Sequence, residues 1–158
     1  TRFKCDWSSD VCSSDLSWKN WADDYFYIEH RHETRGIGGI FFDRIPVTTE
    51  TDLDKMIQLT SDLANVYPVI YAKLMKDNGL RSFTEAEKHW QKIRRGRYVE
   101  FNLIYDRGTK FGLESEGNIE SILVSLPAEV EWVYKHQPAP ESAEAKTLEL
   151  LRKGIDWV

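Results

Sequence analysis

The sequence lacks a long hydrophobic run. No stretch of its 158 residues approaches the run of about 20 apolar residues that a membrane-spanning helix needs. Its first residues also lack the basic segment followed by an apolar segment that is typical of a signal peptide. These two absences predict a protein with no integral membrane segment and a cytoplasmic location.

Cysteine is scarce, and both cysteines, Cys5 and Cys12, lie in the tract 1–16. This tract is rich in Ser and Asp and shows neither a helical nor a strand period. Its stretch CDWSSDVCSSDL resembles the translated sequencing-adapter tracts seen at the ends of metagenomic reading frames, and the chain has no initiator Met. We therefore expect residues 1–16 to be non-native and the chain to be truncated at its N-terminus. The remainder has no cysteine, which fits a reducing compartment.

Several motifs of nucleotide, hydrolase and metal chemistry are also missing. The glycines of 36–39 are followed by an apolar run instead of the helix that a dinucleotide loop requires. There is no P-loop and no G-x-S-x-G motif, and no H-x-x-x-H pair that would suggest a complete metal site. The net charge of -5 disfavours a nucleic-acid partner.

What is present is the composition of a folded protein, with local clusters of positive charge. Hydrophobic residues make up 41% of the chain and charged residues 30%, and the length allows one domain or part of one. Positive side chains gather in two clusters, one with Arg31 and Arg35, the other with Arg94, Arg95, Arg97, Arg107 and Lys110. The clusters could meet around an anionic small molecule, or they could be solvated faces with ordinary surface ion pairs.

Hydrophobic periodicity predicts a mixture of strands and helices. Strands are expected over 25–28, 36–43, 98–105, 109–113, 119–126 and 129–134, the first two as a hairpin. Helices are expected over 49–74, 84–94 and 141–153, with an N-cap among 49–51, a kink or division at Pro68 and a stop at Gly96. The pattern predicts an α+β fold with a largely antiparallel β-sheet flanked by helices.

One group of candidate site residues surrounds His30. On a strand, Arg31, Glu33 and Arg35 would share one face, so that two guanidinium groups flank one carboxylate. Such a face can bind anionic oxygens, but it can equally be a buried Arg–Glu–Arg lattice that fixes the hairpin. A single histidine at a strand end is more often a hydrogen-bonded structural residue than a ligand.

A second candidate is Asp106 with Arg107, placed directly after the predicted strand 98–105. Strand ends often carry functional groups, because the strand fixes the backbone while the side chain reaches an open site. An aspartate here can accept N–H hydrogen bonds or act as a base, and an arginine can pair with a carboxylate. The alternative is a plain turn that Asp106 caps and in which Gly108 has a positive φ.

Three segments of the chain resemble one known family. Residues 19–43, KNWADDYFYIEHRHETRGIGGIFFD, are similar to the signature of the oxygen-dependent coproporphyrinogen oxidases, and residues 94–113 and 119–127 are similar to further blocks of that family. The resemblance covers residues 17–158 and implies that they form the C-terminal part of a single coproporphyrinogen oxidase domain. It implies a fragment that is inactive alone, because the family's N-terminal half is absent.

The resemblance also implies a reaction and its residues. The reaction is the oxidative decarboxylation of two propionates of coproporphyrinogen III to vinyl groups, with O2 as co-substrate, no organic cofactor and a homodimer as the enzyme. By the same resemblance, the catalytic residues are Asp106 and Arg107, the substrate-binding residues are Arg35, Glu116, Gly117 and Asn118, and His30 is a possible ligand of a divalent metal.

The sequence departs from the family at three positions. Ala22 replaces a Cys, Arg44 replaces an Asp, and Asn118 replaces an Arg and cannot supply its positive charge. The competing interpretation is a non-catalytic tetrapyrrole-binding or dimerisation module of the same fold.

Overall fold

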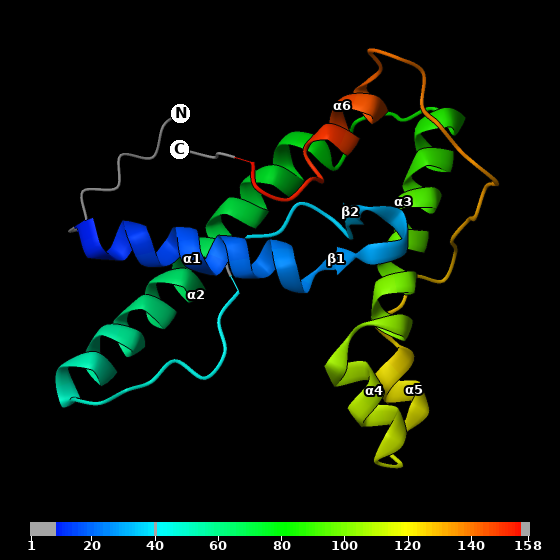
Figure 1. The fold of residues 1–158 in the computed structure, drawn as a ribbon. Coiled ribbons are helices and arrows are strands. Elements are labelled where there is room, and N and C mark those ends of the chain that lie inside the picture. The colour runs from blue at the N-terminus through cyan, green and yellow to red at the C-terminus, as the bar shows by residue number, and fades with distance from the viewer. Residues whose placement is uncertain (1–8, 40, 156–158) are drawn as a thin grey trace. The chain divides into compact units, whose positions relative to one another are not determined.

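The computed structural model describes residues 9–39 and 41–155, with side chains from residue 16 onward. Cys5 and the side chain of Cys12 lie outside this description. The described residues belong to two compact units: unit 1 comprises 1–42 and 85–158, and unit 2 comprises 43–84. The elements of unit 1 are α1 (Ser9–Tyr25), β1 (Tyr27–Ile28), the 3-10 helix η1 (Glu29–Arg31), β2 (Glu33–Thr34), α3 (Glu85–Ile104), α4 (Arg107–Glu114), α5 (Ile119–Leu123) and α6 (Ala143–Glu149) (Figure 1).

The fold is mostly helical, and the prediction of a largely antiparallel sheet flanked by helices is wrong. Within the described part, the sheet has two short strands, β1 and β2, paired antiparallel with Tyr27 opposite Thr34 and Ile28 opposite Glu33. The first strand of the predicted hairpin is confirmed, but the second strand is Glu33–Thr34, and the predicted strand 36–43 is wrong. The chain reverses earlier than expected because η1 is followed by His32 in the left-handed region, with φ 55°.

The aromatic residues after β2 pack against α1 instead of forming a strand. The Phe41 ring lies 5.4 Å from the Trp21 ring, and the Phe42 ring lies 5.0 Å from the Trp18 ring. Helix α1 begins at Ser9, inside the tract for which no period was evident. The apolar run at 41–42 therefore belongs to the helix–loop packing of unit 1.

The predicted strand 98–105 is wrong, because α3 continues through Gly96 to Ile104. Val99 and Phe101 are buried as the alternation suggested, but Leu103 is 45% exposed. The buried face of α3 also includes two charged side chains, Arg97 and Glu100. An analysis of hydrophobic periodicity treats charged residues as solvent-facing. The helical period of this buried face was therefore not visible in the sequence.

Two further predicted strands, 109–113 and 119–126, are instead the helices α4 and α5. Their N-caps are Asp106 and Asn118, whose side chains accept hydrogen bonds from backbone N–H groups three residues later. Helices α4 and α5 pack against each other beyond the end of α3 (Figure 1).

The last part of unit 1 is also less regular than expected. Residues 129–134 form no strand, and this segment lies against α3 through a hydrogen bond from the Glu131 N–H to the Lys92 carbonyl. The final helix, predicted over 141–153, is confirmed as the shorter α6, which Ser142 caps.

Unit 2 contains the helix α2 (Glu50–Asn78). Its start agrees with the prediction, because Thr49 is the N-cap and forms a reciprocal capping box with Asp52. Pro68 lies inside α2 and does not divide it. None of the helices described is both long enough and apolar enough to cross a membrane.

The core of unit 1 joins the hairpin, α3 and the C-terminal segment. Its largest fully buried side chains are Phe101, Ile28, Ile93 and Leu151. The Thr34 N–H and the Thr34 hydroxyl both donate to the Leu151 carbonyl, at 2.8 and 3.2 Å. The hairpin is thus held between α3 and a segment more than a hundred residues later in the chain.

Gly96 allows the segment 129–132 to approach α3 closely, and we expect Gly96→Ala to destabilise unit 1. A Cβ at this position would lie 2.9 Å from the Glu131 carbonyl oxygen and 3.4 Å from the Trp132 ring nitrogen. The clash should cost about 1–3 kcal/mol, although alanine normally favours a helix over glycine. Urea denaturation followed by circular dichroism measures the change.

Gly36→Ala is the control, because a Cβ there meets no atom within 4 Å. We expect no loss of stability in this variant. A Gly96→Ala protein as stable as the parent would show that the segment can move away from α3 at no cost.

Candidate functional site

Tyr25, the last residue of α1, lies in an aromatic cluster built from three parts of unit 1. Its ring stacks on Phe41 with centroids 5.0 Å apart, and it meets Phe26 and Phe101 edge-on at 4.9 and 5.8 Å. Phe101 is a fully buried residue of α3. The ring of Tyr25 is therefore fixed by contacts from the loop, the hairpin side and α3.

Asp106 lies at the junction of α3 and α4, and its two carboxylate oxygens have different partners. Its Oδ2 accepts hydrogen bonds from the Thr109 N–H at 2.7 Å and the Thr109 hydroxyl at 2.9 Å. Its Oδ1 accepts a hydrogen bond from the Tyr25 hydroxyl at 3.1 Å. Asp106 thus caps the chain as the plain-turn alternative had it, but it caps the helix α4, and Gly108 does not have a positive φ.

Asp106 is an ionised hydrogen-bond acceptor at neutral pH. Burial by itself would raise the pKa of its carboxyl group, but the hydrogen bonds from Thr109 and Tyr25 and the nearby charge of Arg35 together lower that pKa below its ordinary value. A carboxylate held in this way accepts N–H hydrogen bonds well and is a weak base.

Arg35 follows β2, and its guanidinium group lies on aromatic rings. The Cζ atom is 4.1 Å from the centroid of Phe26, 5.2 Å from that of Tyr98 and 5.5 Å from that of Phe101. Among the described residues, Arg35 forms no ion pair and its buried Nε has no hydrogen-bond partner. Burial lowers its pKa, and the charge of Asp106 partly opposes that change.

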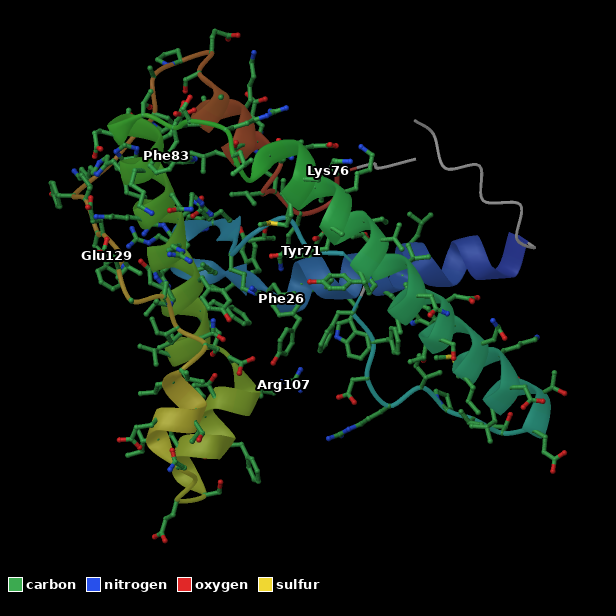
Figure 2. The ribbon with its side chains drawn as sticks, turned by 180° about the vertical axis from the view of Figure 1, so that it is seen from behind. Phe26, Tyr71, Lys76, Phe83, Arg107 and Glu129 are labelled. Atoms are coloured by element: carbon green, nitrogen blue, oxygen red, sulfur yellow. The ribbon has the colours of Figure 1, made fainter. Side chains whose placement is uncertain are left out.

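Arg107, the first residue of α4, completes this group of side chains. Its guanidinium Cζ lies 4.9 Å from the centroid of the Tyr25 ring, and its backbone N–H approaches the Tyr25 hydroxyl at 3.4 Å. Phe26 and Arg107, which both contact the Tyr25 ring, are labelled in Figure 2. We call Tyr25, Arg35, Asp106 and Arg107 the Tyr25 group: it places one carboxylate near two guanidinium groups, which suits a ligand with both N–H donors and carboxylates.

His30 belongs to a different cluster, centred on Glu100 of α3. The Nε2 of His30 donates to the Glu100 carboxylate at 2.9 Å, and its Nδ1 lies 2.8 Å from the Tyr105 hydroxyl. Both ring nitrogens are therefore engaged, and a metal ligand role would require one of these hydrogen bonds to break. No group of three or more His, Cys, Asp or Glu side chains in the described part is arranged to hold a metal.

Glu100 also accepts hydrogen bonds from three other side chains. Arg31 donates through Nε at 2.9 Å and Nη2 at 2.7 Å, Arg97 through Nη1 at 3.0 Å, and Trp132 through its ring N–H at 2.8 Å. Burial would raise the pKa of Glu100, but the hydrogen bonds from Arg31 and His30 and the charge of Arg97 lower it to about 2. The side chain is 9% exposed, so the charge is held inside the protein and not at its surface.

The predicted face with Glu33 between Arg31 and Arg35 is wrong. Glu33 pairs with Arg94 at 2.7 Å and Arg97 at 3.3 Å, both from α3. The alternative of an Arg–Glu–Arg lattice fits better, although it uses the arginines of α3. The two positive clusters do meet at Glu100, which accepts hydrogen bonds from Arg31 of one cluster and Arg97 of the other.

The loop 116–118 has a structural role in the packing of α4 against α5. Asn118 caps α5 by accepting the Ser121 N–H at 2.8 Å, and a Cβ at Gly117 would lie 2.9 Å from the Gly112 carbonyl. Glu116 has φ 57°. No hydrogen bond or ion pair among the described residues links this loop to the Tyr25 group, so its substrate-binding role stays a prediction.

The sequence interpretation missed Tyr25, Tyr105, Glu100 and Trp132. It assigned Tyr25 to the predicted strand 25–28, and it assigned Glu100 to the solvent-facing side of the predicted strand 98–105. Aspartate is one of the residue types favoured at helix N-caps, so Asp106 was the feature of the sequence that could have predicted the start of α4.

Comparison with known proteins gives concordant matches. A family model described as coproporphyrinogen III oxidase matches residues 5–157. The oxygen-dependent coproporphyrinogen-III oxidase, mitochondrial, of Homo sapiens is 52% identical over 141 residues, which are 89% of this chain and 30% of that protein. The coproporphyrinogen-III oxidase 1, chloroplastic, of Arabidopsis thaliana is 46% identical over 140 residues, 89% of this chain and 36% of that protein. The chain thus spans about a third of the length of these relatives.

Proposed function

This chain belongs to the coproporphyrinogen III oxidase family, and from that premise we propose that it is the part of an oxygen-dependent coproporphyrinogen III oxidase that binds the tetrapyrrole through Asp106 and Arg107. The observation that carries the proposal is the Tyr25 group, in which an ionised Asp106 lies near the guanidinium groups of Arg35 and Arg107. The substrate offers the matching groups, pyrrole N–H donors and propionate carboxylates.

The proposed reaction converts each of two propionates to a vinyl group. The carbon next to the pyrrole ring loses a hydrogen as one proton and two electrons, and the carboxylate leaves as CO2 while the electrons of its C–C bond form the vinyl double bond. O2 takes up the two electrons, that proton and one proton from solvent to become H2O2. The substrate is electron-rich enough for this step once a pyrrole N–H is polarised. The "oxygen-dependent" names of the relatives support O2 as the co-substrate.

Asp106 acts as the acceptor of pyrrole N–H hydrogen bonds. Its lowered pKa favours this role over that of a general base, because a carboxylate that is hard to protonate removes a proton poorly. The negative charge raises the electron density of the ring and stabilises positive charge that develops as the ring is oxidised.

Arg35 and Arg107 hold propionates. Arg35 has a buried Nε that lacks a partner among the described residues, and a carboxylate can supply one. Holding the carboxylate fixes the propionate relative to the ring, so the protein contributes orientation as well as charge. Glu116, Gly117 and Asn118 remain proposed as a substrate-binding loop.

Other features belong to the same proposal. The enzyme acts as a homodimer without an organic cofactor, and a divalent metal at His30 would displace a hydrogen bond to Glu100 or Tyr105. The cytoplasmic location stays a prediction, and the names of several relatives place those proteins in mitochondria or chloroplasts.

The test is an aerobic assay of coproporphyrinogen III conversion, in which the product is oxidised and protoporphyrin fluorescence is measured. The assay compares this chain with a completed protein, in which the chain is joined to the preceding part of the human relative. Activity in the completed protein alone is the expected result. A completed protein that is folded and binds porphyrin without turnover would favour the non-catalytic binding module.

A further inference from the structure

We propose that Tyr25 is a positioning residue that orients Asp106 and Arg107 toward the tetrapyrrole. This inference rests on the proposed function and assigns a role to a residue outside the predicted site. The Tyr25 hydroxyl donates to Asp106 Oδ1 at 3.1 Å and lies 3.4 Å from the Arg107 backbone N–H, so one oxygen contacts both residues.

The two oxygens of Asp106 differ in what holds them. Oδ2 is engaged by Thr109 in the ordinary manner of a helix N-cap, which any capping aspartate would show. Oδ1 is the oxygen that remains for a ligand, and among the described residues its donor is Tyr25. Because an ionised oxygen accepts more than one hydrogen bond, the Tyr25 contact leaves room for a pyrrole N–H and fixes the direction from which it approaches.

The hydroxyl can act in this way because the ring itself is immobile. Phe26, Phe41 and Phe101 contact it with centroids between 4.9 and 5.8 Å away. The hydroxyl therefore connects the end of α1 to the start of α4, across 81 residues of sequence. The same ring lies under the Arg107 guanidinium, which restricts that side chain on the same scaffold.

Tyr25→Phe removes the hydroxyl and keeps every ring contact. In the completed protein we expect kcat to fall about tenfold, as for the loss of one hydrogen bond to a charged group, with KM changed by less than about threefold. The groups that act on the Asp106 carboxylate are Thr109 of α4, Arg35 after β2 and the Tyr25 hydroxyl of α1. With the Tyr25 donor gone, the pKa of Asp106 should rise, and the acid limb of the pH–rate profile should move to higher pH.

The matched control is Tyr27→Phe. Tyr27 is two residues away in β1, and its ring contacts Lys153 and not Asp106. We expect its kcat and its pH profile to equal those of the parent. In an Asp106→Ala background, Tyr25→Phe should cause no further loss of kcat, because the hydroxyl acts through Asp106 and the ring that holds the Arg107 guanidinium is still present.

A measurement of the pKa of Asp106 that does not depend on turnover tests this inference separately from the proposed function. Carbon-13 NMR titration of Asp106 in the completed protein should show a higher pKa in Tyr25→Phe than in the parent. An unchanged pKa together with an unchanged kcat would overturn the role of Tyr25. A raised pKa in a protein that turns over no coproporphyrinogen would support the role of Tyr25 and reject the proposed function.

Discussion

Replacing Asp106 with asparagine is expected to lower the kcat of the completed protein at least about 100-fold, the scale measured when an electrostatic partner of a transition state is removed. Asparagine keeps an oxygen that can cap α4, so the fold around Thr109 should persist. It lacks the negative charge that the proposal assigns to the pyrrole contact. The aerobic assay with coproporphyrinogen III measures the change.

Asp106→Ala separates the capping role from the chemical role. It should lose kcat to a similar extent and also lose about 1 kcal/mol of stability, because no side-chain oxygen remains to accept the Thr109 N–H. An Asp106→Asn protein with the turnover of the parent would remove Asp106 from the mechanism and leave it as a helix cap.

The largest effect on stability is expected for Glu100→Gln. This carboxylate accepts hydrogen bonds from Arg31, His30, Arg97 and Trp132, and its side chain is 9% exposed. The substitution removes the counter-charge of Arg31 and one of the two carboxylates that pair with the buried Arg97, which should cost about 3 kcal/mol. Urea denaturation of the parent and the variant at neutral pH measures the difference.

Glu129→Gln is the matched control for Glu100→Gln. Glu129 pairs with Lys92 at the surface, and its side chain is 68% exposed. Exposed pairs of this kind contribute less than about 1 kcal/mol. Equal stability losses in the two variants would show that the buried cluster of Glu100 contributes no more to the free energy of unfolding than an exposed ion pair.

The same residue predicts how stability depends on pH. The folded-state pKa of Glu100 is about 2, below the ordinary value of 4.5. Its contribution is therefore complete above pH 4.5 and is lost as the pH falls from 4.5 toward 2. The Glu100→Gln variant should lose less stability than the parent over that interval.

The sequence predicted those elements whose local signals agreed with their packing. The N-cap candidates among 49–51 and the apolar residues at three- and four-residue spacing identified α2, and the aromatic run before His30 identified the first strand of the hairpin. The predicted helix 84–94 is confirmed as the first half of α3, but the continuation to Ile104 was missed because its buried face carries Arg97 and Glu100. Charged residues on an inner face become acceptable only when partners such as Arg31 and Trp132 arrive from elsewhere in the chain, and no local pattern reveals those partners.

The residues of the candidate site were also predicted only in part, and those that depend on distant contacts were missed. Arg35, Asp106 and Arg107 were identified from the family resemblance, and they lie together in unit 1. Tyr25 was not identified, because its role depends on a contact with a residue 81 positions away. The separation of His30 from this group was equally hidden, since its partner Glu100 was assigned to a strand that does not exist.

The hydrogen bonds from Thr34 to the Leu151 carbonyl set a constraint on biosynthesis. The hairpin is made before the residue that closes over Thr34, which follows 117 positions later. Because the ribosome releases residues in order, the hairpin lacks this partner until Leu151 has been made. Unit 1 is therefore expected to complete its folding only after Leu151 has left the ribosome, and ribosome-bound chains that end before Leu151 should expose the hairpin to proteases.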